Sequence, residues 1–333
     1  MNRNEEAESD FIKAMQLAPE LSYPYNYMGV LRECQGEEEE ALEYYLKAIT
    51  IGEREQDYCD EAYQNAASIF CRNCDYVHAI DMLQRGYELF KNPNFLLEEI
   101  HMLRRNEEFK AAEALLKEYR SRKGLGRLSK EYMLEKAHIL RDSGMEEAAF
   151  DLYDVASVES SEAGLEAGKY LFYKRKYRKA LKYFRTAMKV YREEREPDFL
   201  LADYCLWASR AALESGKEDE ALELAREGML LIPEDYETME SCLPMILQTR
   251  GGLLGILGRV EEAEETLKWA LNQRKCDYCL HGICIDAFFE MAYLLAKQGR
   301  RREALQCLKQ ARLADTVDYD LKKLQEMIDK GKL

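Results

Sequence analysis

The chain has 333 residues, 47% of them hydrophobic and 33% charged, and its formal net charge is −15 at pH 7. This acidity argues against nucleic acid as a partner, since nucleic-acid-binding proteins need clustered Lys and Arg to neutralise phosphates. No run of about 18 apolar residues could span a membrane, and the N-terminus lacks the apolar stretch of a signal peptide. The ten scattered cysteines favour reduced thiols, so we expect a cytoplasmic protein.

A recurring alanine is the strongest pattern in the chain. It returns at Ala7, Ala41, Ala79, Ala112, Ala149, Ala180, Ala221, Ala263 and Ala304. In most repeats a bulky residue follows the alanine by four positions and a small residue follows it by seven. Steps of four and three place all three on one face of a helix. Another small residue usually precedes the alanine by twelve positions, in an upstream helix. The spacing predicts stacked pairs of helices.

Residues 1–21 are predicted to form half a repeat. Ala7, Phe11 and Ala14 have the pattern of a second helix, and Pro19 falls where that helix should stop. The stacking face of such a half-repeat has no upstream helix of its own to cover it. Two interpretations are open: the repeat array begins further upstream, or another chain packs here in an end-to-end association.

Residues 22–316 are predicted to form eight repeats, each with a turn between its two helices. Five repeats place a glycine five residues before the alanine, at Gly36, Gly144, Gly216, Gly258 and Gly299. Glycine relieves the left-handed conformation that often ends a helix. The other three carry an aromatic residue three positions before the alanine, at Tyr76, Phe109 and Tyr177. We expect the helix pairs to break at these places, with no β-sheet.

Residues 317–333 are predicted to form a capping helix. Leu321, Leu324 and Ile328 form one apolar stripe, and charged residues occupy the rest of the helix. No Gly/Ser-rich or Pro-rich linker interrupts the chain, and each repeat of a solenoid contacts only its neighbours. We therefore expect residues 1–333 to form a single all-α domain.

One stretch matches a known repeat family well. Its matching residues are Tyr25, Met28, Gly29, Gly36, Ala41, Tyr45 and Ala48, and the stretch from Gly299 to Ala311 matches too. This pattern resembles the tetratricopeptide repeat, and the chain resembles bacterial solenoids of that family. The resemblance implies a right-handed superhelical solenoid of helix pairs, in which the first helix of each pair lines a concave groove. It also implies protein binding as the activity.

The groove-facing positions follow from the packed small residue of each first helix. Over four consecutive repeats they predict a row of leucines beside a row of cationic or titratable side chains. The predicted groove residues are Leu97, His101, Arg104, Leu134, His138, Arg141, Leu165, Lys169, Leu206 and Arg210. Leucine pockets and cations together would suit a peptide segment, and an acidic one in particular. The carboxylate clamp known in the family is not evident.

A cysteine-rich segment lies between the last two repeats. Cys276, Cys279, His281 and Cys284 supply four zinc-ligand types within nine residues. The spacing matches neither a zinc knuckle nor a two-pair ribbon. Two alternatives therefore stay open: a redox-active or incidental thiol pair, and packing of these cysteines as small apolar residues.

No catalytic motif stands out in the chain. We therefore expect a non-enzymatic scaffold that binds a protein or peptide in the concave groove and needs no cofactor. Two alternatives stay open: a peptide-sensing module of a bacterial signalling system, and a zinc-binding repeat protein that uses the Cys276–Cys284 cluster.

Overall fold

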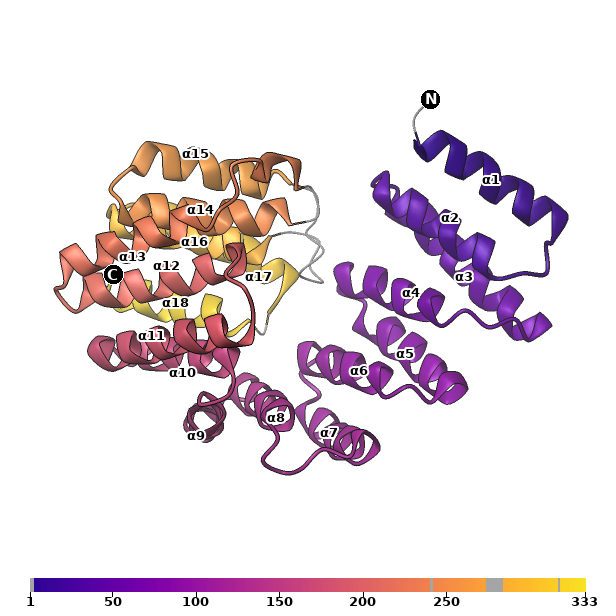
Figure 1. Ribbon diagram of the computed structural model, residues 1–333, viewed down its shortest axis with the longest axis horizontal. Coiled ribbons are helices and arrows are strands. Elements are labelled where there is room, and N and C mark those ends of the chain that lie inside the picture. Colours follow the sequence, from indigo (N-terminus) through magenta and orange to yellow (C-terminus); the bar gives the residue numbers. More distant parts are fainter. Residues whose placement is uncertain (1–2, 240–241, 274–283, 317) are drawn as a thin grey trace. The chain divides into compact units, whose positions relative to one another are not determined.

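The computed structural model describes residues 3–239, 242–273, 284–316 and 318–333. The chain divides into two compact units, Met1–Lys123 and Gly124–Leu333, which are taken in turn (Figure 1). Over the described ranges every regular element is a helix and none is a strand. No helix of those ranges is both long and apolar enough to cross a membrane.

From residue 3, where the described part begins, the first unit contains a lone helix followed by three helix pairs. The lone helix is α1 (Arg3–Leu17), and the pairs are α2 (Tyr23–Cys34) with α3 (Glu38–Glu55), α4 (Asp60–Arg72) with α5 (Tyr76–Phe90), and α6 (Pro93–Arg105) with α7 (Phe109–Lys123). Each helix packs against the next along the chain.

In its described residues the second unit contains five helix pairs and a final helix. The pairs are α8 (Lys130–Asp142) with α9 (Glu146–Ala156), α10 (Ser161–Tyr173) with α11 (Tyr177–Glu194), α12 (Phe199–Glu214) with α13 (Glu218–Leu230), α14 (Leu243–Ile256) with α15 (Val260–Leu271), and α16 (Ile285–Lys297) with α17 (Arg301–Ala314). A short 3₁₀ helix, η1 (Tyr236–Thr238), precedes α14, and α18 (Tyr319–Asp329) closes the unit. The predicted stripe of α18 is buried: Leu321, Leu324 and Ile328 are 0–3% exposed.

The recurring alanines form the seam between the two helices of each pair. All eight from Ala41 to Ala304 are at most 1% exposed. The small residue of the first helix meets the bulky residue of the second across this seam. A Cβ atom added to Gly168 would lie 2.4 Å from Cε1 of Phe184, and one on Gly29 would lie 2.6 Å from Cε1 of Tyr45. The helices approach this closely because the first helix has no side chain there.

The turns confirm the predicted breaks between helices. All five predicted glycines have a φ angle between 75° and 88°. In the other three repeats, Cys74, Glu107 and Arg175 occupy the same position and have φ angles of 59° to 60°. The turn therefore keeps its left-handed geometry without glycine, at the strain that a side chain with positive φ carries.

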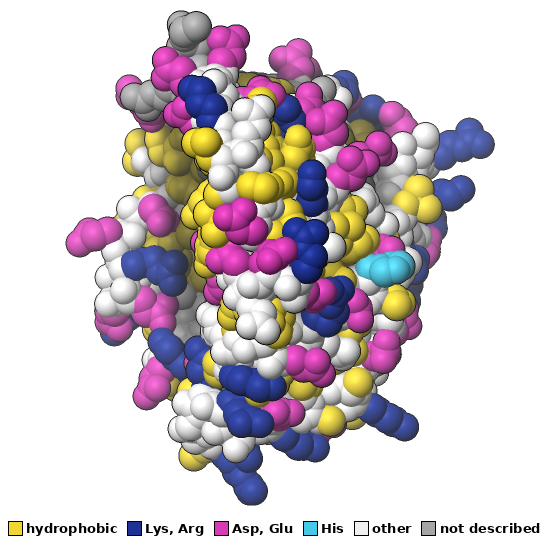
Figure 2. All heavy atoms as spheres, turned by 90° about the vertical axis from the view of Figure 1, so that its right-hand side faces the viewer, with side chains coloured by type: hydrophobic (Ala, Val, Ile, Leu, Met, Phe, Trp, Pro, Cys, Tyr) yellow, Lys and Arg dark blue, Asp and Glu magenta, His cyan; other side chains and the backbone are white. Residues whose placement is uncertain are grey.

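The predicted fold class, an all-helical solenoid of stacked helix pairs with a closing helix, is confirmed. The surface of the chain carries charges of both signs: basic and acidic side chains are interspersed over the face in Figure 2, and hydrophobic side chains gather in its upper part. Exposed ion pairs of this kind each contribute about 0–1 kcal/mol to stability, so the buried seams carry the fold.

Candidate functional site

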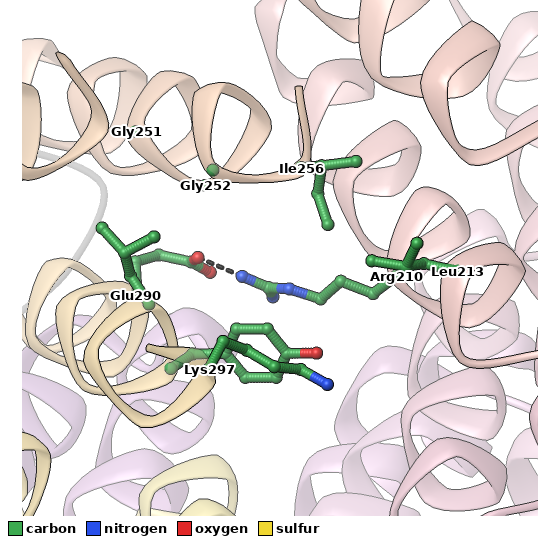
Figure 3. A pocket seen from close by; sticks show the side chains of 10 residues that line it. Arg210, Leu213, Gly251, Gly252, Ile256, Glu290 and Lys297 are labelled. Atoms are coloured by element: carbon green, nitrogen blue, oxygen red, sulfur yellow. Dashed lines mark hydrogen bonds and ion pairs between the residues drawn. The ribbon is translucent and has the colours of Figure 1, made fainter. Parts of the chain in front are cut away.

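A pocket of about 160 Å³ lies among the first helices α12, α14 and α16 of the second unit. We call the surface formed by α8, α10, α12, α14 and α16 the first-helix face. The residues that line the pocket are Arg210, Leu213, Gly251, Gly252, Gly255, Ile256, Glu290, Tyr293, Leu294 and Lys297 (Figure 3). Each of the three helices contributes side chains or bare backbone, so the pocket exists only when three successive repeats are stacked.

The glycines of α14 make room for the pocket. A Cβ atom on Gly252 would lie 2.6 Å from both Oε2 of Glu290 and Cδ2 of Leu206. Side chains from α12 and α16 therefore meet over the bare backbone of α14. Gly251 has a different role, because its missing side chain accommodates Leu267 of α15. Close packing of neighbouring side chains on the backbone of α14 therefore accounts for both glycines.

Arg210 and Glu290 form a buried ion pair across the pocket. Their side chains point toward one another from α12 and α16 (Figure 3), and Nη2 of Arg210 donates to Oε2 of Glu290. Arg210 is 1% exposed and Glu290 is 4% exposed. The guanidinium carbon lies 4.5 Å from the ring centre of Tyr293 and 5.0 Å from that of Trp207. The guanidinium is thus held by cation–π contacts with these two rings as well as by the charge of Glu290.

Burial of the pair is incompletely compensated by hydrogen bonds. Nε and Nη1 of Arg210 and the hydroxyl of Tyr293 have no hydrogen-bond partner among the described residues. Burial raises the pKa of Glu290 to about 7, although Arg210 acts in the opposite direction. The guanidinium remains protonated, so the pocket has a fixed positive charge beside a carboxyl that binds a proton near neutral pH.

The remaining walls of the pocket are apolar, and the side chain of Lys297 lies beside them. Leu213 is 36% exposed and Leu294 is 9% exposed, while Ile256 is half-buried. Lys297 Nζ donates to Oε1 of Glu214. A bound group would thus meet hydrocarbon on the walls and a guanidinium at the Arg210–Glu290 pair.

The residues predicted to line a groove divide between the two units. Leu97, His101 and Arg104 lie half-buried on α6 of the first unit. The other seven lie on α8, α10 and α12 of the second unit. Leu165, Leu206 and Arg210 are 8%, 0% and 1% exposed. For these three the expectation of an open groove position needs correction, because they are buried in the packed unit. Leu206 lies against Gly252 of α14, and Arg210 pairs with Glu290 of α16. Only Arg210 also lines the pocket.

The other predicted cations of the second unit already contact carboxylates. Nη1 of Arg141 lies 2.6 Å from Oε2 of Glu166. Nζ of Lys169 lies 3.3 Å from Oε1 of Glu166 and 3.0 Å from Oδ2 of Asp320. His138 Nε2 lies 4.0 Å from Oε1 of Glu162. A partner carboxylate would have to compete with these internal acids.

Helix α18 supplies one of those acids from the far end of the chain. Asp320 accepts hydrogen bonds from Lys169 at 3.0 Å and from the Tyr173 hydroxyl at 2.9 Å. Lys323 of the same helix lies 2.5 Å from Glu146 of α9. The closing helix is therefore held against α9 and α10 by these contacts. Its Asp320 pairs with Lys169, one of the cations predicted from the sequence to bind a partner carboxylate.

Several carboxyl groups of the second unit have raised pKa values. Burial raises the pKa of Asp318 to about 8, with the charge of Asp320 adding to the effect. Burial and the charges of Glu166 and Glu135 raise the pKa of Glu162 to about 7. These groups bind protons more tightly in the folded chain than in the unfolded chain. Folding is therefore favoured as the pH falls through this range.

We expect the second unit to become more stable between pH 8 and pH 6, by about 1–2 kcal/mol from Asp318 alone. The Asp318 carboxylate also caps α18 by accepting from the amide of Leu321 at 2.8 Å. Asp318→Asn keeps a capping oxygen and removes the titration. Melting temperatures across this pH range should rise less on acidification in Asp318→Asn than in the parent chain, and equal slopes would contradict the assignment.

The predicted zinc cluster stays a prediction. Cys276, Cys279 and His281 lie outside the described residues, and Cys284 immediately precedes α16. If the cluster holds zinc, metal analysis of the purified protein should find about one equivalent per chain. Cys279→Ser should lose the metal, whereas Cys74→Ser, at an exposed thiol in the first unit, should keep it. A metal-free parent chain would refute the site.

Sequence reasoning missed Glu290, Lys297 and the apolar walls of the pocket. A signal for Glu290 was present: it precedes the small residue Ala292 by two positions, as Glu166 precedes Gly168. Both carboxylates bind cations of the first-helix face. The repeated register therefore identifies an acidic row that neutralises the cationic one.

No known protein-family model matches the chain. Among solved structures, a tetratricopeptide repeat protein from Parabacteroides merdae is 15% identical, with a TM-score of 0.45 over 82% of this chain and 99% of that chain. The apo form of the quorum sensor NprR from B. thuringiensis is 13% identical, with a TM-score of 0.49 over 92% of this chain and 81% of that one. YrrB, described as "a TPR protein with an unusual peptide-binding site", is 23% identical, with a TM-score of 0.39 over 57% and 94%.

At these identities the likeness concerns the fold alone. The assignment rests on what the chain itself shows: paired helices, small-to-large seams and left-handed turns at one repeated register. The chain is a helical repeat solenoid with the fold of tetratricopeptide repeat proteins.

Proposed function

We propose that the chain is a non-enzymatic scaffold that binds a peptide segment of a partner protein on the first-helix face of the second unit. One side chain of the segment would enter the pocket between α12, α14 and α16. Cys34, Cys59, Cys205 and Cys307 are free thiols, which supports a reducing, cytoplasmic setting for this interaction.

The size of the pocket carries the proposal. Sites for whole small molecules and cofactors enclose roughly 300–1,000 Å³, and this one encloses about 160 Å³. A space of that size suits a single side chain. Anchors of this kind contribute most of the affinity in protein–protein interfaces when they fill a desolvated pocket.

The walls indicate where the affinity would arise. Leu213 and Ile256 offer hydrocarbon to a partner, while the cations of the face are largely neutralised by Glu166, Glu290 and Asp320. Exposed charge pairs add only about 0–1 kcal/mol each. Apolar burial in the pocket should therefore dominate, with a weak dependence on salt.

Selection from a random peptide display library tests this proposal. The parent chain should enrich peptides with a shared motif, and Leu213→Asp should weaken their binding at least tenfold because it places a charge in the apolar wall. Leu230→Asp is the matched control, since Leu230 is 86% exposed and does not line the pocket. Equal loss in both variants, or no enriched motif, would refute the proposed site.

A further inference from the structure

The pocket has charged side chains as well as apolar walls, and an apolar anchor would make no use of the charged ones. Its charged lining residues are Arg210, Lys297 and Glu290. The guanidinium of Arg210 has three nitrogens, and only Nη2 has an acceptor among the described residues. Burying a donor without an acceptor costs free energy that a ligand oxygen would recover.

Resting on the proposed function, we propose that the side chain entering this pocket is an acidic one, and that Arg210 binds its carboxylate. The methylene groups of a glutamate would lie against Leu213 and Ile256, and the carboxylate would meet the guanidinium. Arginine suits this task because its planar donors match carboxylate oxygens.

A side-chain carboxylate fits the pocket better than the C-terminal carboxylate of a peptide. A chain terminus would bring its own backbone N–H and C=O groups into the pocket, and those groups need partners when buried. Apart from Arg210, Glu290, Tyr293 and Lys297, the lining offers only aliphatic side chains and three glycines. A side chain leaves the partner backbone outside, on the first-helix face.

The neighbouring carboxyl must accommodate the incoming charge. The charged groups that act on Glu290 are Asp203 and Arg210 of α12 and Asp286 of α16. Glu214 of α12 and Tyr177 of α11 act on the adjoining Tyr293, and Lys297 lines the same pocket, while the α14 lining has no charged side chain. The pKa of Glu290 is already raised to about 7. A second carboxylate beside it favours its protonated form further. Binding should therefore take up a proton and be tighter at pH 6 than at pH 8.

Trp207 provides a direct reporter of the pocket. It is 4% exposed and lies 5.0 Å from the Arg210 guanidinium. The chain has two tryptophans, so Trp269→Phe leaves Trp207 as the single emitter. Three pools of hexapeptides, randomised at all other positions, serve as probes: blocked at both ends with one fixed Glu, the same with Gln, and the Gln pool with a free C-terminal carboxylate.

We expect the Glu pool to shift Trp207 emission at concentrations at least tenfold lower than the Gln pool does, with a larger preference at pH 6 than at pH 8. The double variant Arg210→Met/Glu290→Met should lose this preference while remaining folded. Equal binding of the two blocked pools would overturn the carboxylate proposal and leave peptide binding standing. Tightest binding of the free-carboxylate pool would also overturn it, in favour of a chain terminus. Binding of no pool would refute the proposed function itself.

Discussion

Arg210→Met is expected to lower the free energy of unfolding of the second unit by about 3–5 kcal/mol. The substitution leaves the Glu290 carboxyl buried with no cation opposite it, and removing one partner of a buried ion pair typically has this effect. Replacing both partners is different, since two apolar side chains of similar volume need no compensation. Arg210→Met/Glu290→Met should therefore recover most of the loss.

Urea unfolding followed by Trp207 emission in the Trp269→Phe background measures both variants. We expect the urea midpoint of Arg210→Met to be far below the midpoints of the parent chain and of Arg210→Met/Glu290→Met, and the last two midpoints to be similar. A double variant as unstable as Arg210→Met would mean that the rings of Trp207 and Tyr293 hold Arg210 independently of Glu290. Raising the pH from 6 to 8 should deepen the loss in Arg210→Met, because the buried Glu290 carboxyl, whose pKa burial already raises, must then ionise without a cation opposite it. The double variant lacks this carboxyl and should not show the added loss.

Phe184→Ala is expected to destabilise the second unit by about 3–5 kcal/mol, the usual range for deleting a fully buried ring. Phe184 is 0% exposed and packs directly on the backbone of Gly168. Gly168→Leu alone should cost about 1–3 kcal/mol, because the new side chain would collide with the ring. The double variant places the large side chain on the first helix and the small one on the second helix of the same seam.

The combined variant should be more stable than the sum of the two single effects predicts, which double-mutant analysis of the urea midpoints would show as a favourable coupling of about 0.5–3 kcal/mol. Leu313→Ala is the matched control for side-chain truncation, since Leu313 is 78% exposed and exposed substitutions usually change stability within about 0.5 kcal/mol. Strict additivity of Phe184→Ala and Gly168→Leu would contradict the seam.

The helix pairs and their turns could be predicted because their determinants lie close together in the sequence. Gly168 meets Phe184 sixteen residues later, and the glycine of each turn precedes the seam alanine by five residues. Side-chain size, helical periodicity and the left-handed freedom of glycine are all properties of short segments. The same register even identified Arg210 as a residue of the first-helix face.

Tertiary structure decided what those residues meet. Arg210 pairs with Glu290, 80 residues further along, and Lys169 with Asp320, 151 residues further along. Such contacts depend on how successive repeats curve and on how closely the bare backbone of Gly252 lets α12 and α16 side chains approach. The curvature sums small rotations over several repeats, and no local pattern encodes that sum. The sequence alone therefore predicts a stack of helix pairs with cations on the first helices. Only the tertiary structure shows that these cations form ion pairs with internal carboxylates and that one of them, Arg210, lines a pocket.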